Sequence, residues 1–254
     1  PRPENNADGF RAIDWDARTA TDAVSDDVGA MFPGDFFNQG TFPRARGAMI
    51  TMEPGTMMRL SAVAESGEPA NFGVPAGEFA AFSPERLFGL ANGNEVSVTF
   101  MDPANPALPA TVDGFGAVFA GNDVPGSTFI EYFDLAGRLV YRVDAPVAGD
   151  GGFSFAGAAF PSAIVARVRI TAGSLGVDRC AEEDGAALDC VAMDDFVYGE
   201  PQPVTADFTA AGGSQAEGAV AETFARFKAE LGPFNPPRPE NNADGFRAID
   251  WDAR

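Results

Sequence analysis

Pairs of aspartates are the residues in this sequence that could most readily do chemistry. Asp14 and Asp16 flank Trp15 in the segment FRAIDWD, and Asp194 and Asp195 open the segment DDFVYG. Because alternate residues of a strand point to the same side, Asp14 and Asp16 are expected to share one face. Carboxylate oxygens are the ligands that Ca²⁺ prefers. The sequence therefore predicts a calcium site formed by Asp14, Asp16, Asp194 and Asp195.

The same carboxylates have two other interpretations, which the sequence leaves open. They could be solvated or paired with arginines, since no D-x-[DN]-x-[DN]-G-x5-E calcium loop is present. They could also be the acid pair of a glycosidase, which needs a defined separation across a cleft. The chain has no histidine, which removes the Ser-His-Asp arrangement and the commonest zinc ligand. We therefore expect a protein that is not an enzyme, with calcium as its only cofactor.

The two cysteines, Cys180 and Cys190, lie in the acidic segment DRCAEEDGAALDC. A disulfide between them would close a small surface loop, and two cysteines alone cannot form a zinc site. The alternative is a pair of free thiols in a reducing compartment. We predict the disulfide, and with it an extracellular or cell-surface location.

The charge balance excludes two classes of partner. The 254 residues include 17 basic and 37 acidic side chains, for a formal net charge of −20. Such a surface repels the phosphates of nucleic acids and of anionic membranes. No apolar run reaches the roughly 18 residues that a membrane helix requires. We expect neither nucleic-acid binding nor membrane insertion.

An internal repeat dominates the organisation of the chain. The segment PRPENNADGFRAIDWDAR occupies residues 1–18 and recurs unchanged at residues 237–254. A repeat at fixed spacing usually indicates an array of units, so we expect one period of a tandem array plus an overlap. The alternative is a segment duplicated by engineering or by circular permutation. The predicted division is a β-sandwich domain at 1–201, a linker strand and helix at 202–236 that open the next unit, and its start at 237–254.

Composition and local pattern both predict short strands. The chain has 29 Gly, 20 Pro and 23 Phe, which favours turns and β-structure over long helices. Apolar residues alternate with others at 95–100, 115–119 and 164–170, the period of half-buried strands. Residues 128–133 and 138–143 flank a turn at 134–137 and predict a hairpin. The predicted fold is a mainly β, antiparallel, jelly-roll-like β-sandwich.

One amphipathic helix is predicted near residues 214–231. It begins with the capping box Ser214 to Glu217, and Val220, Phe224 and Phe227 follow at helical spacing. The apolar stripe must pack against something. It could cover its own sandwich, or it could contact a neighbouring unit.

Several strand motifs resemble a known group of proteins. The segments FGAVF, STFIEYFDLAGRLV, FSFAGAAF, IVARVRI and MDDFVYGEP are similar to secreted bacterial lectin-like (jelly-roll) β-sandwich proteins of unassigned function, over about residues 80–201. The segment AETFARFKAELG…GFRAIDWD resembles the part that opens such domains. The resemblance implies an extracellular, non-catalytic sandwich, often attached to the cell surface and sometimes with bound calcium.

Two functions follow as hypotheses. The first is an extracellular structural unit of a repetitive fibre or surface array, whose partners are copies of itself. Neighbouring units would be joined through residues 204–254 by strand addition, with five apolar side chains as the assembly residues: Phe224, Phe227, Phe246, Ile249 and Trp251. The alternative is a calcium-dependent carbohydrate-binding module, which would show exposed aromatic side chains beside an acidic site. The Trp and Tyr residues are themselves expected mainly in the core.

Overall fold

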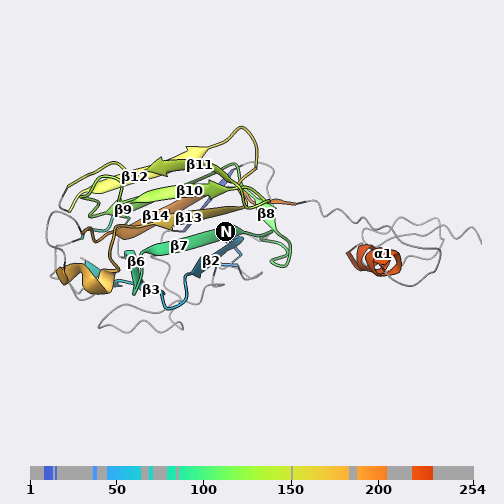
Figure 1. Ribbon diagram of the computed structural model, residues 1–254, viewed down its shortest axis with the longest axis horizontal. Coiled ribbons are helices and arrows are strands. Elements are labelled where there is room, and N and C mark those ends of the chain that lie inside the picture. Colours follow the sequence, from blue (N-terminus) through green and yellow to red (C-terminus); the bar gives the residue numbers. More distant parts are fainter. Residues whose placement is uncertain are drawn as a thin grey trace, which may run out of the picture. The chain divides into compact units, whose positions relative to one another are not determined.

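The computed structural model describes ten stretches of the chain: residues 9–13, 15, 37–38, 45–63, 69–70, 79–83, 86–149, 151–182, 188–204 and 219–230. The chain divides into two compact units, Pro1–Val204 and Thr205–Arg254. The first unit contains the sandwich, and the second contains one helix (Figure 1). Each unit is described by itself.

One layer of the sandwich is a six-stranded sheet. Its strands are β1 (Phe10–Ile13), β3 (Met57–Leu60), β6 (Phe88–Ala91), β9 (Gly114–Ala120), β12 (Phe153–Ala159) and β14 (Ala192–Gly199). The order is β12-β9-β14-β6-β3, and β1 also pairs with β14. On one side β14 pairs with β9, while its other side meets β6 at Met193 and β1 from Phe196 to Gly199. Strand β14 therefore organises this layer.

The second layer is a five-stranded antiparallel sheet, with the order β11-β10-β13-β7-β2 from top to bottom in Figure 1. Its strands are β2 (Ala48–Met52), β7 (Glu95–Phe100), β10 (Phe129–Phe133), β11 (Leu139–Asp144) and β13 (Arg167–Thr171). Two short pairs complete the strands, β4 (Ala62–Val63) with β5 (Pro69–Ala70) and β8 (Ala110–Thr111) with β15 (Gln202–Pro203). This arrangement confirms the predicted antiparallel, jelly-roll-like β-sandwich.

The alternating residues that the sequence assigned to the core do form it. In β7 the side chains of Val96, Val98 and Phe100 are buried, and they join buried residues of both sheets in one cluster. In β13, Val168 and Ile170 are buried, whereas Ile164 precedes the strand and is exposed. Burial of the apolar residues that the two sheets turn toward each other holds the sheets together, because these residues are removed from water.

The predicted hairpin is confirmed as β10 and β11. At its turn the amide of Gly137 donates to the carbonyl of Asp134 over 2.9 Å, and Gly137 has a φ of 73°. The Asp134 side chain accepts the amides of Ala136 and Arg138, each at 2.9 Å. A carboxylate that caps the turn in this way fixes its register.

The segment FRAIDWD differs from its prediction as one continuous strand. The strand ends at Ile13, and Trp15 has a φ of 56°, a left-handed backbone conformation outside the strand region. Ile13 and Trp15 are nevertheless both buried, as predicted for residues that share the core-facing side. Asp14 and Asp16 lie outside the described residues.

The second unit contains helix α1 (Ala219–Glu230), which confirms a helix within the predicted range. Val220, Phe224 and Phe227 are exposed. The capping box at 214–217, residue 231 and the repeated segment 237–254 lie outside the described residues. Among the described residues, no helix is both long enough and apolar enough to cross a membrane.

Residues 202–204 were assigned to the linker by the sequence. In the structure Gln202 and Pro203 pair with Thr111 and Ala110, and the amide of Val204 donates to Pro109 over 2.9 Å. The first unit accordingly extends to Val204.

The predicted disulfide joins Cys180, in the 3-10 helix η1 (Val177–Glu182), to Cys190. Both cysteines are buried in a small apolar cluster with Phe79 and Leu87. Closing a loop of this length is worth about 3 kcal/mol in the chain-entropy model.

We expect reduction of the disulfide to lower the free energy of unfolding by about 3 kcal/mol, measured by urea titration with and without dithiothreitol. A Cys180→Ser/Cys190→Ser variant should match the reduced protein and no longer respond to the reductant; equal stability of both redox forms would contradict the prediction.

Candidate functional site

The acidic pair Asp194 and Asp195 lies at an irregularity in β14. The pairing of β14 with β9 shifts register between Met193 and Phe196, so the two aspartates occupy the shift. Asp194 is buried and Asp195 is half-buried. A register shift re-aims side chains, and here it turns both carboxylates toward the segment that contains Phe82 and Ser83.

Backbone amides and one hydroxyl hold these carboxylates. Asp194 Oδ2 accepts the amides of Phe82 and Ser83 at 2.6 Å and 3.3 Å. Ser83 Oγ lies 3.0 Å from an oxygen of each aspartate. A hydroxyl has only one hydrogen to donate. Ser83 therefore shares its one hydrogen between the two carboxylates or donates to one of them at a time.

The surroundings of Asp194 favour its protonated form. Burial raises the pKa of Asp194 to about 6, the amide and hydroxyl hydrogen bonds oppose this, and the negative charge of Asp195 adds to it. Desolvation and a neighbouring like charge both disfavour a carboxylate. Asp194 is thus a buried acid that ties two segments together.

The predicted calcium ligands are only partly located. Asp194 and Asp195 do lie together, whereas Asp14 and Asp16 lie outside the described residues. Among the residues that the structure describes, no group of three or more Asp, Glu or Cys side chains is arranged to hold a metal ion. The calcium site remains a prediction.

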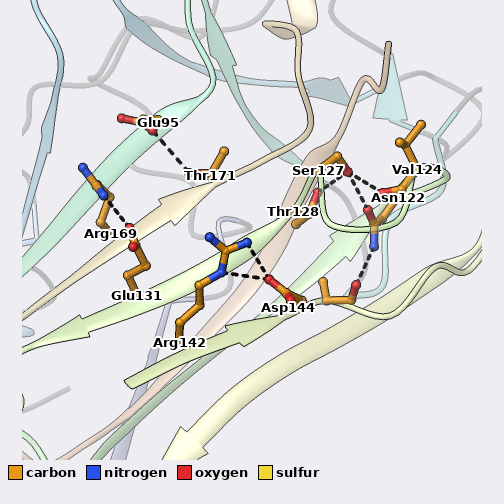
Figure 2. Close-up of polar contacts among 11 residues, drawn as sticks. Glu95, Asn122, Val124, Ser127, Thr128, Glu131, Arg142, Asp144, Arg169 and Thr171 are labelled. Carbon is orange, nitrogen blue, oxygen red and sulfur yellow. Dashed lines mark hydrogen bonds and ion pairs between the residues drawn. The ribbon is translucent and has the colours of Figure 1, made fainter. Parts of the chain in front are cut away.

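Another acid, Asp189, has the same anchoring role as Asp194. It is fully buried, and its carboxylate accepts the amide of Asp123 over 3.2 Å and the hydroxyl of Ser127. Ser127 Oγ also lies 2.8 Å from the carbonyl oxygen of Val124, so its one hydrogen is shared between these two acceptors (Figure 2). These buried carboxylates hold loops to the sandwich by accepting their backbone and hydroxyl donors.

Three exposed phenylalanines form a group that we call the phenylalanine platform: Phe82, Phe153 and Phe155, which are 58%, 40% and 56% exposed. The backbone amide of Phe82 donates to Asp194, so this edge of the platform lies beside the acidic pair. Phe82 and Phe153 pack edge to face, with ring centroids 5.7 Å apart. Phe153 and Phe155 alternate with buried residues on β12, so both point away from the core. Large apolar side chains gathered in this way commonly mark a binding surface.

Glycines make room for the ring of Phe155. A Cβ atom at Gly116 would lie 2.6 Å from Phe155 Cζ, and one at Gly157 would lie 3.0 Å from it. These glycines pair with each other on β9 and β12. The ring therefore rests on the sheet backbone, and its other side is open to solvent.

The outer face of the five-stranded sheet has a different character, and we call it the arginine face. Strand register places Glu131 between Arg142 on β11 and Arg169 on β13, and Arg169 donates to Glu131 at 2.6 Å and 2.8 Å (Figure 2). Arg142 bonds Asp144 at 2.8 Å and 3.0 Å. The charges on this face are thus largely paired with each other.

Aromatic rings on the arginine face are covered by guanidinium groups. Arg142 Cζ lies 3.5 Å from the centroid of Phe129, and Arg167 Cζ lies 3.9 Å from that of Phe133. These are cation–π contacts. Cations therefore already occupy the ring faces of Phe129 and Phe133. The phenylalanine platform, in contrast, exposes three neighbouring aromatic rings, while Phe10 and Tyr141 are exposed elsewhere in the sandwich.

The sequence anticipated some of the aromatic positions. Tyr132 and Tyr198 are buried, as expected, while Tyr141 is exposed. The platform was not predicted, although the alternation in FSFAGAAF could have identified Phe153 and Phe155 as outward-facing. The sequence around Phe82 has no comparable pattern. Phe82 belongs to the platform because its ring packs against that of Phe153 in the folded structure.

The class defined by these observations is a jelly-roll-like β-sandwich with an exposed aromatic surface. No family model matches the chain, and no curated protein matches it. Among solved structures it is similar to the CBM22-1 xylan-binding domain of Xyn10C from Paenibacillus barcinonensis, with 11% identity, 68% of this chain and 96% of that chain covered, and a TM-score of 0.31.

Two further structures are also similar. One is TmCBM61 in complex with β-1,4-galactotriose, at 12% identity, with 66% of this chain and 92% of that chain covered and a TM-score of 0.29. The other contains the CBM22-1 and GH10 modules of Xyn10B from Clostridium thermocellum with xylohexaose, at 17% identity, with 73% and 30% covered and a TM-score of 0.30. At these TM-scores the neighbours do not identify a family.

The buried acid gives a pH-dependent stability that can be tested. A pKa of about 6 in the folded state lies above the ordinary value of 3.8, so Asp194 favours folding below about pH 4 and this contribution is lost as the pH rises through 6. From pH 4 to pH 7, the free energy of unfolding of wild type relative to that of Asp194→Asn should fall by about 2.5 kcal/mol, measured by urea unfolding. The exposed Asp144→Asn variant is the control, and a constant difference between wild type and Asp194→Asn would contradict the shift.

Proposed function

We propose that the β-sandwich is a secreted glycan-binding module and that the phenylalanine platform is its binding surface. The observation that carries this proposal is the exposed ring of Phe155, supported on glycines and flanked by Phe153, with Phe82 beyond it. Apolar faces of sugar rings stack on aromatic side chains in the way other apolar ligands do. The buried disulfide is consistent with an oxidising, extracellular compartment.

The chemistry of the surroundings favours neutral glycans. The formal net charge of −20 repels anionic polysaccharides. Half-buried Asp195 lies next to the platform, held through Ser83, which follows Phe82 in the chain. A carboxylate accepts hydrogen bonds from sugar hydroxyls. Stacking on Phe153 and Phe155 with a hydroxyl bonded to Asp195 would give both affinity and orientation.

Binding fits this acidic pair better than catalysis. A glycosidase needs two carboxyl groups on opposite sides of the scissile bond. Asp194 is buried and accepts backbone amides, and it shares Ser83 with its neighbour. The pair therefore lies on one side of any ligand.

Removing a platform ring should weaken binding. We expect Phe155→Ala to lower the affinity for the best-bound neutral glycan by about tenfold, since an aromatic contact of this kind is worth up to about 1.5 kcal/mol. A glycan array covering neutral and acidic polysaccharides identifies the probe, and isothermal titration with that probe measures the dissociation constant.

A matched control is available in the second unit. Phe224 is 57% exposed, close to the 56% of Phe155, and lies on α1. Phe224→Ala should leave glycan affinity unchanged. Equal affinities of wild type and Phe155→Ala, or no binding to any glycan on the array, would refute the proposed surface.

Calcium dependence is a separate proposal and has its own measurement. If Asp14, Asp16, Asp194 and Asp195 hold Ca²⁺, EDTA should reduce glycan affinity and the melting temperature together, and added CaCl₂ should restore both. Unchanged values with EDTA would refute the calcium site and leave Asp194 and Asp195 as the hydrogen-bonding groups described above.

Self-assembly is a second proposed function, favoured by a different observation. The repeated segment contains the residues of β1, a strand that pairs within the six-stranded sheet. A chain that carries a second, identical copy of one of its own strands also carries a connector for another copy of itself. Fibre or array formation at the cell surface would follow from such a connector.

A further inference from the structure

The first copy of the repeated segment occupies a specific position in the sandwich, which we call the β1 slot. Residues Phe10 to Ile13 pair with β14 in the register Phe10 with Gly199 to Ile13 with Phe196. On this side β14 meets β6 only at Met193. The β1 slot is thus the remaining length of the β14 edge, and the first copy covers it.

A buried ion pair anchors the strand in the slot. Arg11 donates from Nε and Nη2 to the two carboxylate oxygens of Glu200, at 2.8 Å and 2.7 Å, and from Nη1 to the carbonyl of Ala45 at 2.6 Å. Both charged side chains are buried. A buried pair of this kind is costly to break on one side only. With Glu200 in place, the slot therefore selects an arginine at this position.

An aromatic socket holds the end of the segment. The Trp15 ring stacks on Phe88 with centroids 4.2 Å apart, and Phe37 and Phe196 pack against it edge-on. Its indole nitrogen donates to the carbonyl of Asp194 over 3.0 Å. Only an indole fills this socket and also makes that hydrogen bond.

The second copy has every residue that the slot selects. Arg247, Ile249 and Trp251 stand where the first copy has Arg11, Ile13 and Trp15, within an unchanged segment of sequence. We infer that residues 245–251 of one chain fill the β1 slot of another copy of the chain, displacing or replacing its own first copy. This inference rests on the proposed self-assembly and names its site.

Replacing the first copy by the second copy of another chain requires no contact that the sandwich does not already make. The incoming strand would make the same ladder with β14, the same ion pair with Glu200 and the same contacts with Phe88. Identical contacts in both states make strand exchange a low-cost route to dimers, and head-to-tail exchange makes open filaments. It also leaves no uncovered edge on β14.

The same substitution in each copy tests the inference in the full chain. In Trp15→Ala the first copy no longer fills the socket, so the slot should take Trp251 from another chain. We expect a dimer or larger species, at least twice the 26.5 kDa of one chain, whose mass grows with concentration. Trp251→Ala should be monomeric, because its second copy has no indole to fill the socket of another chain. Size-exclusion chromatography with light scattering measures the masses, and near-ultraviolet circular dichroism reports folding.

Each other result counts against the inference. A monomeric or unfolded Trp15→Ala protein overturns it, because the second copy then failed to fill the slot of a neighbour. If both variants associate equally, the chain assembles through another surface and only the β1 slot is refuted. If wild type and both variants are folded monomers, self-assembly is refuted as well.

A charge reversal gives an independent pair of variants. In Glu200→Arg/Arg247→Glu only the second copy matches the slot, and association is expected. In Glu200→Arg/Arg11→Glu only the first copy matches, and a monomer is expected. Equal masses for the two folded variants would overturn the inference by a route that leaves both tryptophans in place.

Discussion

The buried residue Asp194 joins the parts of the sandwich that matter for both proposals. Its carboxylate accepts the amides of Phe82 and Ser83, and its carbonyl accepts the indole of Trp15. The Asp194 side chain therefore fixes Phe82 of the phenylalanine platform, and the Asp194 main chain fixes Trp15 of the first repeat copy. The register shift in β14 makes this possible, because a regular strand would not turn the Asp194 carboxylate toward that segment.

Sequence periodicity was sufficient for most of the fold. Strands β7 and β13 follow from alternation, since burial of one face imposes a period of two. The hairpin β10–β11 follows from its turn residues, whereas β9 is buried on both faces although its sequence alternates. The helix followed from its apolar spacing. Alternation also predicted the burial of Trp15, but not the positive φ at which the strand has already ended. The disulfide was predictable because the chain offers only one pair of cysteines.

The candidate site was harder to predict because its residues meet only through tertiary packing. The many acidic residues suggested metal ligands. In the structure, however, the carboxylate oxygens of buried Asp189 and Asp194 accept hydrogen bonds from amide and hydroxyl groups. Sequence alone cannot distinguish a carboxylate that caps a loop from one that binds a cation, since both need the same oxygens. The platform depends in the same way on Gly116 and Gly157, whose missing side chains matter only where Phe155 lies over them.

The identity of the two repeat copies has a physical consequence for assembly. Specificity is a difference between affinities, and two identical segments offer the β1 slot identical contacts. The slot cannot choose between them by chemistry, so the choice depends on chain connectivity and on the effective concentration of each copy. The outward-facing Phe10 and Ala12 have identical counterparts in Phe246 and Ala248. A sandwich completed by either copy would therefore present the same outer sheet face, which allows glycan binding and assembly to operate together.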